Sequence, residues 1–408
     1  MNILLINHYA GSIRHGMEFR PYYMAREWQK LGHKVMIVAA TESHVRTVRP
    51  VSDKSVSIED IDGITYAWLR TTKYNGNGVG RVINMFSFLG QLFRHASALL
   101  GSFKPDVVIA SSTYPLDIWP ARHIARKYGA KLVFEVHDLW PLSPIELGGM
   151  SPKHPFIRLL QCAEDYAYKH ADHVVSMLPN VKDYMVSRGM VRGKLHIVPN
   201  GICPEDWLDA PVSADHETVV RLQSLKAAGK RIVGYAGTHG VANALDTVLD
   251  AAALTTDDSI AYVLVGSGPD KDALMARAKQ MSLHNIHFLS PVPKGLIPCV
   301  LQYFDVAYIG LQSQPLFRFG IAPNKLMDYM MAGRPVIMAI NAGNDPVAEA
   351  ACGMTISPEN PALLYQAVSD LLAVPGDERV AMGKRGRNYV LQHHAYEQLA
   401  SSFLSILK

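Results

Sequence analysis

Short apolar runs alternate along this chain with amphipathic segments of helical length, and they do so in two successive blocks. In the first block the apolar runs, which we expect to be strands, are residues 3–6, 35–38, 107–109, 131–136 and 174–176. In the second block they are residues 232–235, 261–265, 286–289, 306–309 and 336–338. Strands that are apolar throughout are typical of parallel sheets covered by helices on both faces. The pattern therefore predicts an α/β protein with two doubly wound domains.

The chain length agrees with two domains, because a single hydrophobic core stops growing at roughly 250–300 residues and this chain has 408. We expect a first domain over residues 1–198 and a second over 231–385. Prolines and glycines are frequent in residues 199–230, which we interpret as the linker region. Residues 386–408 are predicted to form a C-terminal helix that packs back on the first domain.

The composition is that of a globular protein, with 49% hydrophobic and 19% charged residues. Four scattered cysteines without a Cys-x-x-Cys pair predict reduced thiols and a cytoplasmic setting. The first residues lack the features of a signal peptide, and no run approaches the ~20 apolar residues that cross a bilayer. We therefore expect a protein that neither carries its own export signal nor spans a membrane.

The net charge of +4 is unevenly distributed, because residues 1–200 contain 24 Lys and Arg against 16 Asp and Glu. A basic first half can attract anionic lipid headgroups or a phosphorylated acceptor, or it can be a solvated surface without a partner. Residues 81–103 are predicted to form an amphipathic helix. This helix either touches the inner face of the cell membrane or a lipid-linked acceptor, or packs against its own domain. Both pairs of alternatives stay open.

The stretch Phe319–Ile337 carries the most informative pattern in the sequence. Pro323 suits the first turn of a helix and Gly333 suits its end. The loop ahead of Pro323 would present backbone N–H groups at the positive end of that helix, where a diphosphate can be held. Lys325 would add a positive charge, and Asp328 on the same helix face could accept hydrogen bonds from ribose hydroxyls. The other interpretation is an ordinary capped helix with an internal ion pair.

This stretch resembles the signature of the family-4 retaining glycosyltransferases. Further segments resemble the family in the expected order, namely 111–115, 138–141, 198–201, 235–240 and 265–269. Together the segments span nearly the whole chain. The likeness is greatest to bacterial enzymes of O-antigen and capsule assembly, including those assigned to N-acetyl-L-fucosamine transfer. It implies a GT-B fold, in which two Rossmann-like domains face a cleft.

The resemblance also implies roles for individual residues. In the first domain, Gly11 and Ser12 would meet the donor phosphate through backbone N–H groups, and His137 would contact the donor sugar as a catalytic residue. Arg20 would bind acceptor or phosphate, and Asp138 would bind acceptor. In the second domain the expected donor-binding residues are Gly237, Thr238, His239, Gly240, Val292, Arg318, Gly320, Ile321, Ala322, Pro323, Asn324 and Asp328. Lys325 is the second predicted catalytic residue.

Two departures from the family pattern shape these expectations. Gly320 stands where many members have a glutamate, so the backbone of residues 320–324 would have to make its contacts. Thr238, His239 and Asn243 occupy the region where many members have an arginine and a lysine. We therefore expect Lys325 and Arg318 to balance the phosphate charge instead.

Two Asp-x-Asp sequences, at residues 60–62 and 270–272, superficially match a metal-binding motif. We interpret the first as a turn between strands and the second as a helix cap. No metal site, dinucleotide fingerprint or Walker sequence is recognised. We therefore expect no metal, cofactor or nucleic-acid partner.

The predicted function is transfer of a sugar from a nucleotide diphosphate, with uridine as the expected base, to a glycan or lipid-diphosphate-linked acceptor in surface polysaccharide synthesis. The resemblance implies retention of anomeric configuration by same-face attack, with the leaving phosphate helping to deprotonate the acceptor. Two alternatives remain, a sugar-nucleotide epimerase with the same fold and a catalytically silent glycan- or nucleotide-binding protein.

Overall fold

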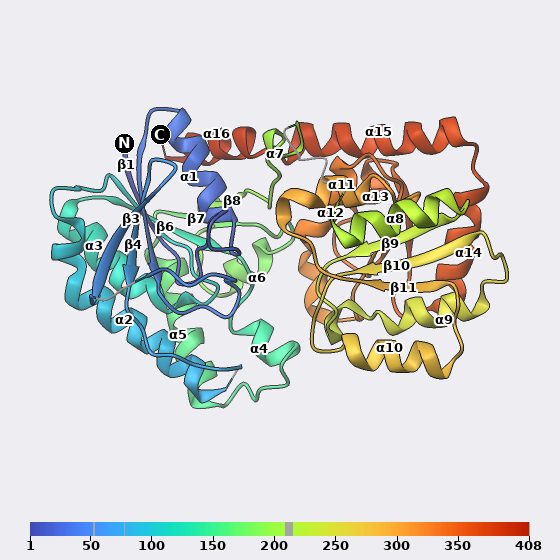
Figure 1. The fold of residues 1–408 in the computed structure, drawn as a ribbon. Helices are drawn as coiled ribbons and strands as arrows, with labels where there is room; N and C mark the ends of the chain where they lie inside the picture. The colour runs from blue at the N-terminus through green and yellow to red at the C-terminus, as the bar shows by residue number, and fades with distance from the viewer. Residues whose placement is uncertain (52–53, 77, 209–214, 408) are drawn as a thin grey trace. The chain divides into compact units, whose positions relative to one another are not determined.

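The computed structural model describes residues 1–51, 54–76, 78–208 and 215–407. The chain divides into two compact units (Figure 1). The first unit comprises Met1–Asn200 together with Tyr396–Lys408, and the second comprises Gly201–Ala395. Both are Rossmann-like α/β domains, as the apolar strand pattern predicts.

An eight-stranded sheet forms the centre of the first unit, in the order β3-β4-β2-β1-β5-β6-β7-β8. Its strands are β1 Asn2–Ile6, β2 Lys34–Ala40, β3 Val56–Ile61, β4 Ile64–Leu69, β5 Val107–Ala110, β6 Lys131–Val136, β7 His173–Ser176 and β8 Leu195–Ile197. All neighbours pair in parallel except β3, which runs antiparallel to β4. The apolar runs did not identify β3, β4 or β8, but β3 and β4 flank the predicted turn between strands, where Asp62 and Gly63 have φ of 54° and 83°.

Helices cover both faces of this sheet. They are α1 Arg20–Lys30, α2 Val79–Leu100, α3 Ile118–Tyr128, α4 Leu142–Glu146, α5 Pro155–His170, α6 Lys182–Ser187 and α16 Tyr396–Ile406. Figure 1 shows α1 and α16 on one side of the sheet and α2, α3 and α5 on the other. The indole of Trp28 on α1 donates to the Ala400 carbonyl of α16 over 3.2 Å, so the C-terminal helix is part of the first unit's core.

The stretch 386–408, for which a single helix is expected, contains parts of two helices. The first, α15 (Gly376–His393), belongs to the second unit, and α16 belongs to the first. Between them His394 leaves helical geometry, and its carbonyl accepts the backbone N–H of Ile202 over 2.8 Å. That bond ties the break to the start of the second unit, a partner far away in sequence that no local pattern reveals.

A six-stranded parallel sheet forms the centre of the second unit, in the order β11-β10-β9-β12-β13-β14. Its strands are β9 Arg231–Ala236, β10 Ile260–Val265, β11 Ile286–Leu289, β12 Val306–Gly310, β13 Val336–Ala339 and β14 Gly353–Ile356. Its longer helices besides α15 are α8 Glu217–Ala227, α9 Asp246–Leu254, α10 Lys271–Gln280, α12 Asn324–Met331 and α14 Pro361–Ala373. Shorter helices are α7 Glu205–Leu208, α11 Ile297–Leu301 and α13 Pro346–Glu349.

Helix α8 lies inside the stretch that the sequence assigned to the linker. Its Leu222 and Leu225 are buried in the core of the second unit, and Lys226 pairs with Asp305 at 2.8 Å. Residues from 217 onward are therefore part of the second domain rather than a connection. Residues 209–214 of the expected linker lie outside the described residues.

Candidate active-site residues in the two domains

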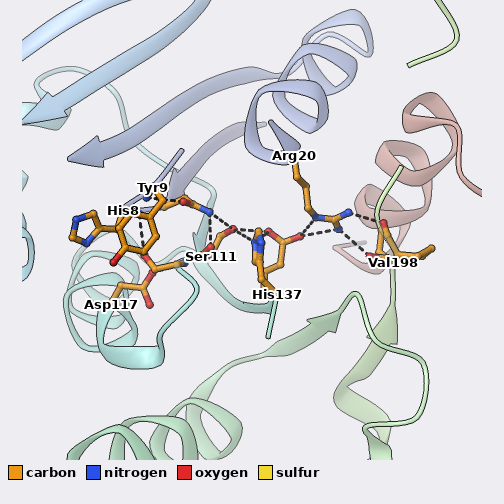
Figure 2. A network of polar contacts seen from close by, with 11 residues as sticks. His8, Tyr9, Arg20, Ser111, Asp117, His137 and Val198 are labelled. Atoms are coloured by element: carbon orange, nitrogen blue, oxygen red, sulfur yellow. Dashed lines mark hydrogen bonds and ion pairs between the residues drawn. The ribbon is translucent and has the colours of Figure 1, made fainter. Parts of the chain in front are cut away.

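Buried polar side chains gather in the first domain where β1, β5 and β6 end. Asn7 follows β1, Ser111 follows β5, and His137 follows β6. The carboxyl ends of neighbouring parallel strands meet at one edge of a sheet, which is where ligands bind in open α/β folds. Figure 2 shows the resulting chain of polar contacts. Asn7 holds the serine in place, since its amide nitrogen donates to the Ser111 carbonyl over 2.6 Å.

Ser111 links His137 to a buried carboxylate. The hydroxyl of Ser111 donates to Glu135 Oε2 over 2.6 Å and lies 2.9 Å from His137 Nε2. A serine hydroxyl has a single proton, and this one goes to Glu135, so His137 must carry a proton on Nε2 and donate it to Ser111. The Nδ1 atom of His137 is then the ring nitrogen that remains available for a hydrogen bond.

Glu135 is ionised despite its burial. Burial by itself opposes the charged form, but the Arg20 guanidinium, His137 and the Ser111 hydroxyl outweigh it and hold the pKa of Glu135 below its usual range. Arg20 Nη2 lies 2.9 Å from Glu135 Oε1. A carboxylate engaged on both oxygens in this way is a fixed anchor, not a free nucleophile.

The predicted role of Arg20 in binding acceptor or phosphate is wrong for this structure. Arg20 is 1% exposed, and besides Glu135 it donates to the carbonyls of Pro199 and Val198, at 2.6 and 2.9 Å (Figure 2). Its guanidinium thus fastens helix α1 to β6 and to the end of the first unit. Sequence alone could not show this, because Glu135 is 115 residues away. Asp138, the other predicted acceptor contact, is exposed directly after His137.

The predicted phosphate contacts of Gly11 and Ser12 are also contradicted. The Gly11 N–H donates to the Glu18 carbonyl over 2.8 Å, and the Ser12 N–H donates to the Gly16 carbonyl over 3.0 Å. The loop after β1 closes on itself so tightly that a Cβ at Gly11 would lie 1.9 Å from the Gly16 oxygen. Glycine is needed there for close packing, and neither N–H points outward to bind phosphate.

Three buried groups beside this cluster were not predicted. Burial raises the pKa of Asp117 to about 7, and its Oδ2 accepts the Ser112 N–H over 2.9 Å. Burial lowers the pKa of His8 well below its usual range, and His8 Nδ1 contacts the Tyr114 hydroxyl. In the sequence, the segment 111–115 is distinguished only by its likeness to the family. Its side chains contact His8 because β5 lies beside β1 in the sheet.

In the second domain, the loop ahead of α12 explains the glycine at position 320. Gly320 is buried with φ of 100°, in the region that residues with a Cβ rarely adopt. Pro323 occupies the N-cap position, so α12 begins at Asn324, one residue later than predicted. A glutamate at position 320 would be strained in this conformation.

The loop's hydrogen bonds limit which backbone groups can meet a ligand. The Ile321 N–H donates to Asn344 Oδ1 over 2.7 Å, and Asn344 returns a bond to the Ile321 carbonyl over 3.1 Å. The predicted Ile321 contact with phosphate through its N–H is therefore wrong, and Pro323 has no N–H to give. The first-turn N–H groups of Asn324 and Lys325 have no acceptor within the helix. They are the donors that α12 offers.

Lys325 extends from α12 to the loop after β9. Its Nζ donates to the Tyr235 hydroxyl over 2.9 Å and contacts Asn243 Oδ1. Its stem crosses Gly237, where a Cβ would lie 3.1 Å from Lys325 Cδ. Burial lowers the pKa of Lys325 to about 8, and no carboxylate in the described part of the chain forms an ion pair with it. Its charge is thus stabilised only by neutral partners.

The glycine-bearing loop after β9 is held by a second loop. The Gly237 and His239 N–H groups donate to the carbonyls of Val265 and Ser267, both over 2.9 Å. Two glycines, Gly266 and Gly268, permit this contact, since a Cβ at Gly268 would lie 2.2 Å from the His239 oxygen. The Thr238 side chain is exposed and Gly240 is partly exposed.

His239 is fully buried beside this loop, and neither of its ring nitrogens has a partner among the described residues. Burial, together with the charges of Lys271 and Lys325, lowers its pKa to about 4. The imidazole is therefore neutral at pH 7. One of its two nitrogens then carries a proton and can donate a hydrogen bond.

Asp328 does not pair with Lys325. It is half-buried on α12, and burial raises its pKa to about 6. Lys325 turns instead to Tyr235, so the simple capped helix with an internal ion pair is not formed. Val292 packs its side chain against the core, and Arg318 is exposed, with Nη1 donating to the Pro315 carbonyl over 2.7 Å.

The Asp-x-Asp sequences have the following contacts. Asp60 Oδ1 accepts the Gly63 N–H over 3.0 Å, as the predicted turn requires. Asp270 precedes α10 without capping it through its side chain, so the predicted cap is wrong there. Within the described residues, no group of three His, Cys, Asp or Glu side chains could hold a metal ion. None of the described helices combines the length and apolar character needed to span a bilayer.

Two family matches cover most of the chain. Residues 15–201 match the family described as "Glycosyl transferase 4-like domain", and residues 230–374 match "Glycosyl transferases group 1". The chain is 21% identical over 297 residues to "Probable glycosyltransferase WbjE" of Pseudomonas aeruginosa, covering 72% of this chain and 71% of that protein. It is 22% identical over 294 residues to "Putative colanic acid biosynthesis glycosyl transferase WcaI" of Escherichia coli, covering 68% and 69%.

Solved structures share the whole fold at low identity. Sucrose-phosphate synthase from Thermosynechococcus elongatus aligns with a TM-score of 0.74 at 17% identity, covering 100% of this chain and 98% of that one. Anabaena Alr3699/HepE in complex with UDP-glucose aligns with a TM-score of 0.68 at 13% identity, covering 100% and 99%. The chain thus consists of a glycosyltransferase 4-like domain followed by a glycosyltransferase group 1 domain, and it is a glycosyltransferase of the GT-B fold.

Proposed function

We propose that this glycosyltransferase moves a sugar from a UDP-linked donor to a glycan or lipid-diphosphate-linked acceptor in surface polysaccharide synthesis, with retention of anomeric configuration. The observation that carries the proposal is the Lys325 ammonium, held beside Gly237 at the positive end of α12 without a carboxylate partner. The relative named for colanic acid biosynthesis supports the pathway class, and the UDP-glucose complex of HepE supports the donor class.

In this proposal the second domain holds the donor. A diphosphate at the start of α12 would accept hydrogen bonds from the Asn324 and Lys325 N–H groups and charge from Lys325. Asp328, four residues after Asn324, would accept from the ribose hydroxyls on the same helix face. The exposed Thr238 and the partly exposed Gly240 would line the donor site, with the fully buried His239 ring behind them. The nucleobase would lie against the backbone near Val292.

Transfer requires the bond between the anomeric carbon and the diphosphate oxygen to break while the acceptor oxygen bonds to that carbon. The negative charge that develops on the departing diphosphate is what Lys325 and the helix end would stabilise. The acceptor proton would pass to the leaving phosphate oxygen on the same face. In the first domain, His137 would support the sugar through Nδ1, because Ser111 occupies its Nε2.

The test begins with thermal unfolding in the presence of nucleotides and nucleotide sugars. We expect UDP and one or more UDP-sugars to raise Tm, and GDP and TDP compounds to have little effect. Transfer to lipid-diphosphate acceptors then follows with the stabilising donor. Donor consumption without acceptor would favour the epimerase, and tight binding without any turnover would favour the silent binding protein. No comparison favours either of these alternatives at present.

A further inference from the structure

A basic pocket lies on the outer face of the first domain, apart from the strand ends that carry Ser111 and His137. Its volume is about 490 Å³, and its lining residues are Trp119, Arg122, His123, Arg126, Lys127 and Tyr166. The first five recur at intervals of three, one, three and one along α3, which places them on a single helix face. Tyr166 comes from α5, which lies on the same side of the sheet (Figure 1).

The cations of this pocket are not neutralised within the protein. Arg122 donates to the Tyr166 hydroxyl and lies 5.1 Å from the centre of that ring. Lys127 donates to the Ser97 hydroxyl of α2 over 2.7 Å. Across the described residues, Arg122, Arg126 and Lys127 have no carboxylate at ion-pair distance. Three positive charges facing one hollow form a site for an anion of high charge density, such as a phosphate.

His170 lies next to the pocket and is affected by the same positive charges. Its ring lies 4.3 Å from the Tyr166 ring. Burial lowers the pKa of His170, and nearby positive charges lower it further; these belong to Arg122, Lys169, Lys194 and Arg126. Asp165, the acidic residue next to Tyr166, is occupied by Arg188 at 2.5 Å. The positive potential therefore extends beyond the pocket along α5.

An exposed apolar row borders the pocket on α2. Val79, Ile83, Phe86 and Phe93 lie on one face of this helix and are 75%, 53%, 44% and 48% exposed. The row reaches the pocket at Phe93, whose ring lies 6.1 Å from that of His123 on α3. Binding of a soluble phosphate would require only the cations of the pocket and would not require an exposed apolar row. Apolar side chains beside cations are what binding at an anionic membrane surface requires.

We propose that this pocket binds the phosphate group of an anionic lipid headgroup, with the apolar row of α2 entering the membrane surface beside it. The inference rests on the first domain alone and does not depend on the donor or on the reaction proposed above. Helix α2 packs on its own domain through buried residues such as Phe88 and Leu92. The proposal assigns its opposite, exposed face to the lipid surface.

Sedimentation with vesicles tests the proposal. The full chain should bind vesicles containing equal amounts of phosphatidylcholine and phosphatidylglycerol, and should bind phosphatidylcholine vesicles weakly. The variant Arg122→Gln/Arg126→Gln/Lys127→Gln should lose on the order of 100-fold in vesicle partitioning, since each cation near an anionic surface contributes roughly fivefold. The matched control Lys279→Gln/Lys384→Gln/Arg387→Gln removes three exposed cations from the second domain and should stay within about twofold of the wild type.

A second measurement distinguishes lipid binding from misfolding of the variants and from binding of a soluble anion. Cys162 is the exposed cysteine, the other three being buried, and it lies one helical turn before Tyr166. A polarity-sensitive dye on Cys162 should shift to shorter wavelength with anionic vesicles, and Phe86→Ser/Phe93→Ser should reduce the shift while Tm is kept. Equal loss in the control variant, or no vesicle binding by the wild type, would overturn the proposal. Binding of pyrophosphate in the pocket without vesicle binding would also overturn it, in favour of a soluble anion.

Discussion

The ammonium of Lys325 on α12 donates a hydrogen bond to the phenol oxygen of Tyr235 on β9, over 2.9 Å. The two residues are 90 positions apart in the chain. The bond brings the start of a helix to the glycine-bearing loop after the first strand of the second domain. It fixes a partly buried cation where a diphosphate would lie, and the hydrogen-bond partners of this cation are neutral groups.

Removing this cation tests the donor site. Lys325→Ala should weaken binding of the nucleotide diphosphate by about 10- to 100-fold, because a hydrogen bond to a charged group contributes roughly 1.5–3 kcal/mol. Isothermal titration calorimetry measures the change, and Lys279→Ala, an exposed lysine of the same domain, serves as control. Unchanged affinity and turnover in Lys325→Ala would remove Lys325 from the site.

The lowered pKa of Lys325 predicts that donor binding depends on pH. With a pKa of about 8 in the free protein, the ammonium loses its proton as pH rises from 7 to 9, and its attraction for the diphosphate is lost with it. The dissociation constant should therefore rise above pH 8, by up to about tenfold per pH unit. Titrations across this range should show the rise in the wild type and a flat profile in Lys325→Ala. The same rise in both proteins would assign it to another group.

The positive φ of Gly320 predicts a cost for any side chain there. Gly320→Ala should lower the free energy of unfolding by about 1–3 kcal/mol, because a residue with a Cβ is strained in this region. Gly295 has no positive φ and open space around it, so Gly295→Ala should change stability by less than about 0.5 kcal/mol. Urea denaturation measures both variants. Equal effects would mean that the loop adapts without strain.

The buried ion pair between Arg20 and Glu135 predicts a large loss of stability when it is broken. Arg20→Ala leaves a buried carboxylate unpaired and should cost about 3–5 kcal/mol. Arg188 forms a half-exposed pair with Asp165, so Arg188→Ala should cost less than about 1 kcal/mol. Denaturant unfolding compares the two. A small effect of Arg20→Ala would argue against the network that holds His137.

The raised pKa of Asp117 predicts how stability changes with pH. Its folded value of about 7 lies above the roughly 3.9 of an unfolded aspartate. Between these values the folded protein holds more protons, so this group's contribution to stability is full below pH 4 and falls as pH rises toward 7. Asp117→Asn should remove this fall, which approaches 1.4 kcal/mol per pH unit. Asp172→Asn, at an exposed aspartate that also accepts a backbone N–H, should keep the wild-type slope in denaturant titrations.

The parts of the fold that sequence predicts are those in which local pattern and burial coincide. The central strands are apolar on both faces, so runs such as 131–136 identify them directly. The edge strand β3 is partly exposed along most of its length, and its pattern is correspondingly weak. Sequence located the α12 region through Pro323 and Gly333, but not the path of the loop before it, which depends on Asn344.

Side-chain roles were harder to predict than strands, because distant partners decide them. Arg20 has the residue type of a phosphate ligand, yet Glu135 and two carbonyls satisfy it inside the domain. Gly11 follows a strand, as phosphate-binding glycines do, yet its N–H closes a loop. Asp117 and Tyr114 gain importance only through contacts with segments that β1 and β5 bring together.

The passage of the chain from α15 to α16 makes the second domain an insertion within the first. A fragment that stops at Asn200 would lack the helix that covers Trp28 and stacks Tyr396 on Tyr23 at 5.0 Å. A single cleavage of the chain therefore cannot separate the two domains without removing part of the core of the first domain. Autonomous expression of the first domain requires residues 396–407 to be rejoined to residues 1–200 through a designed connection.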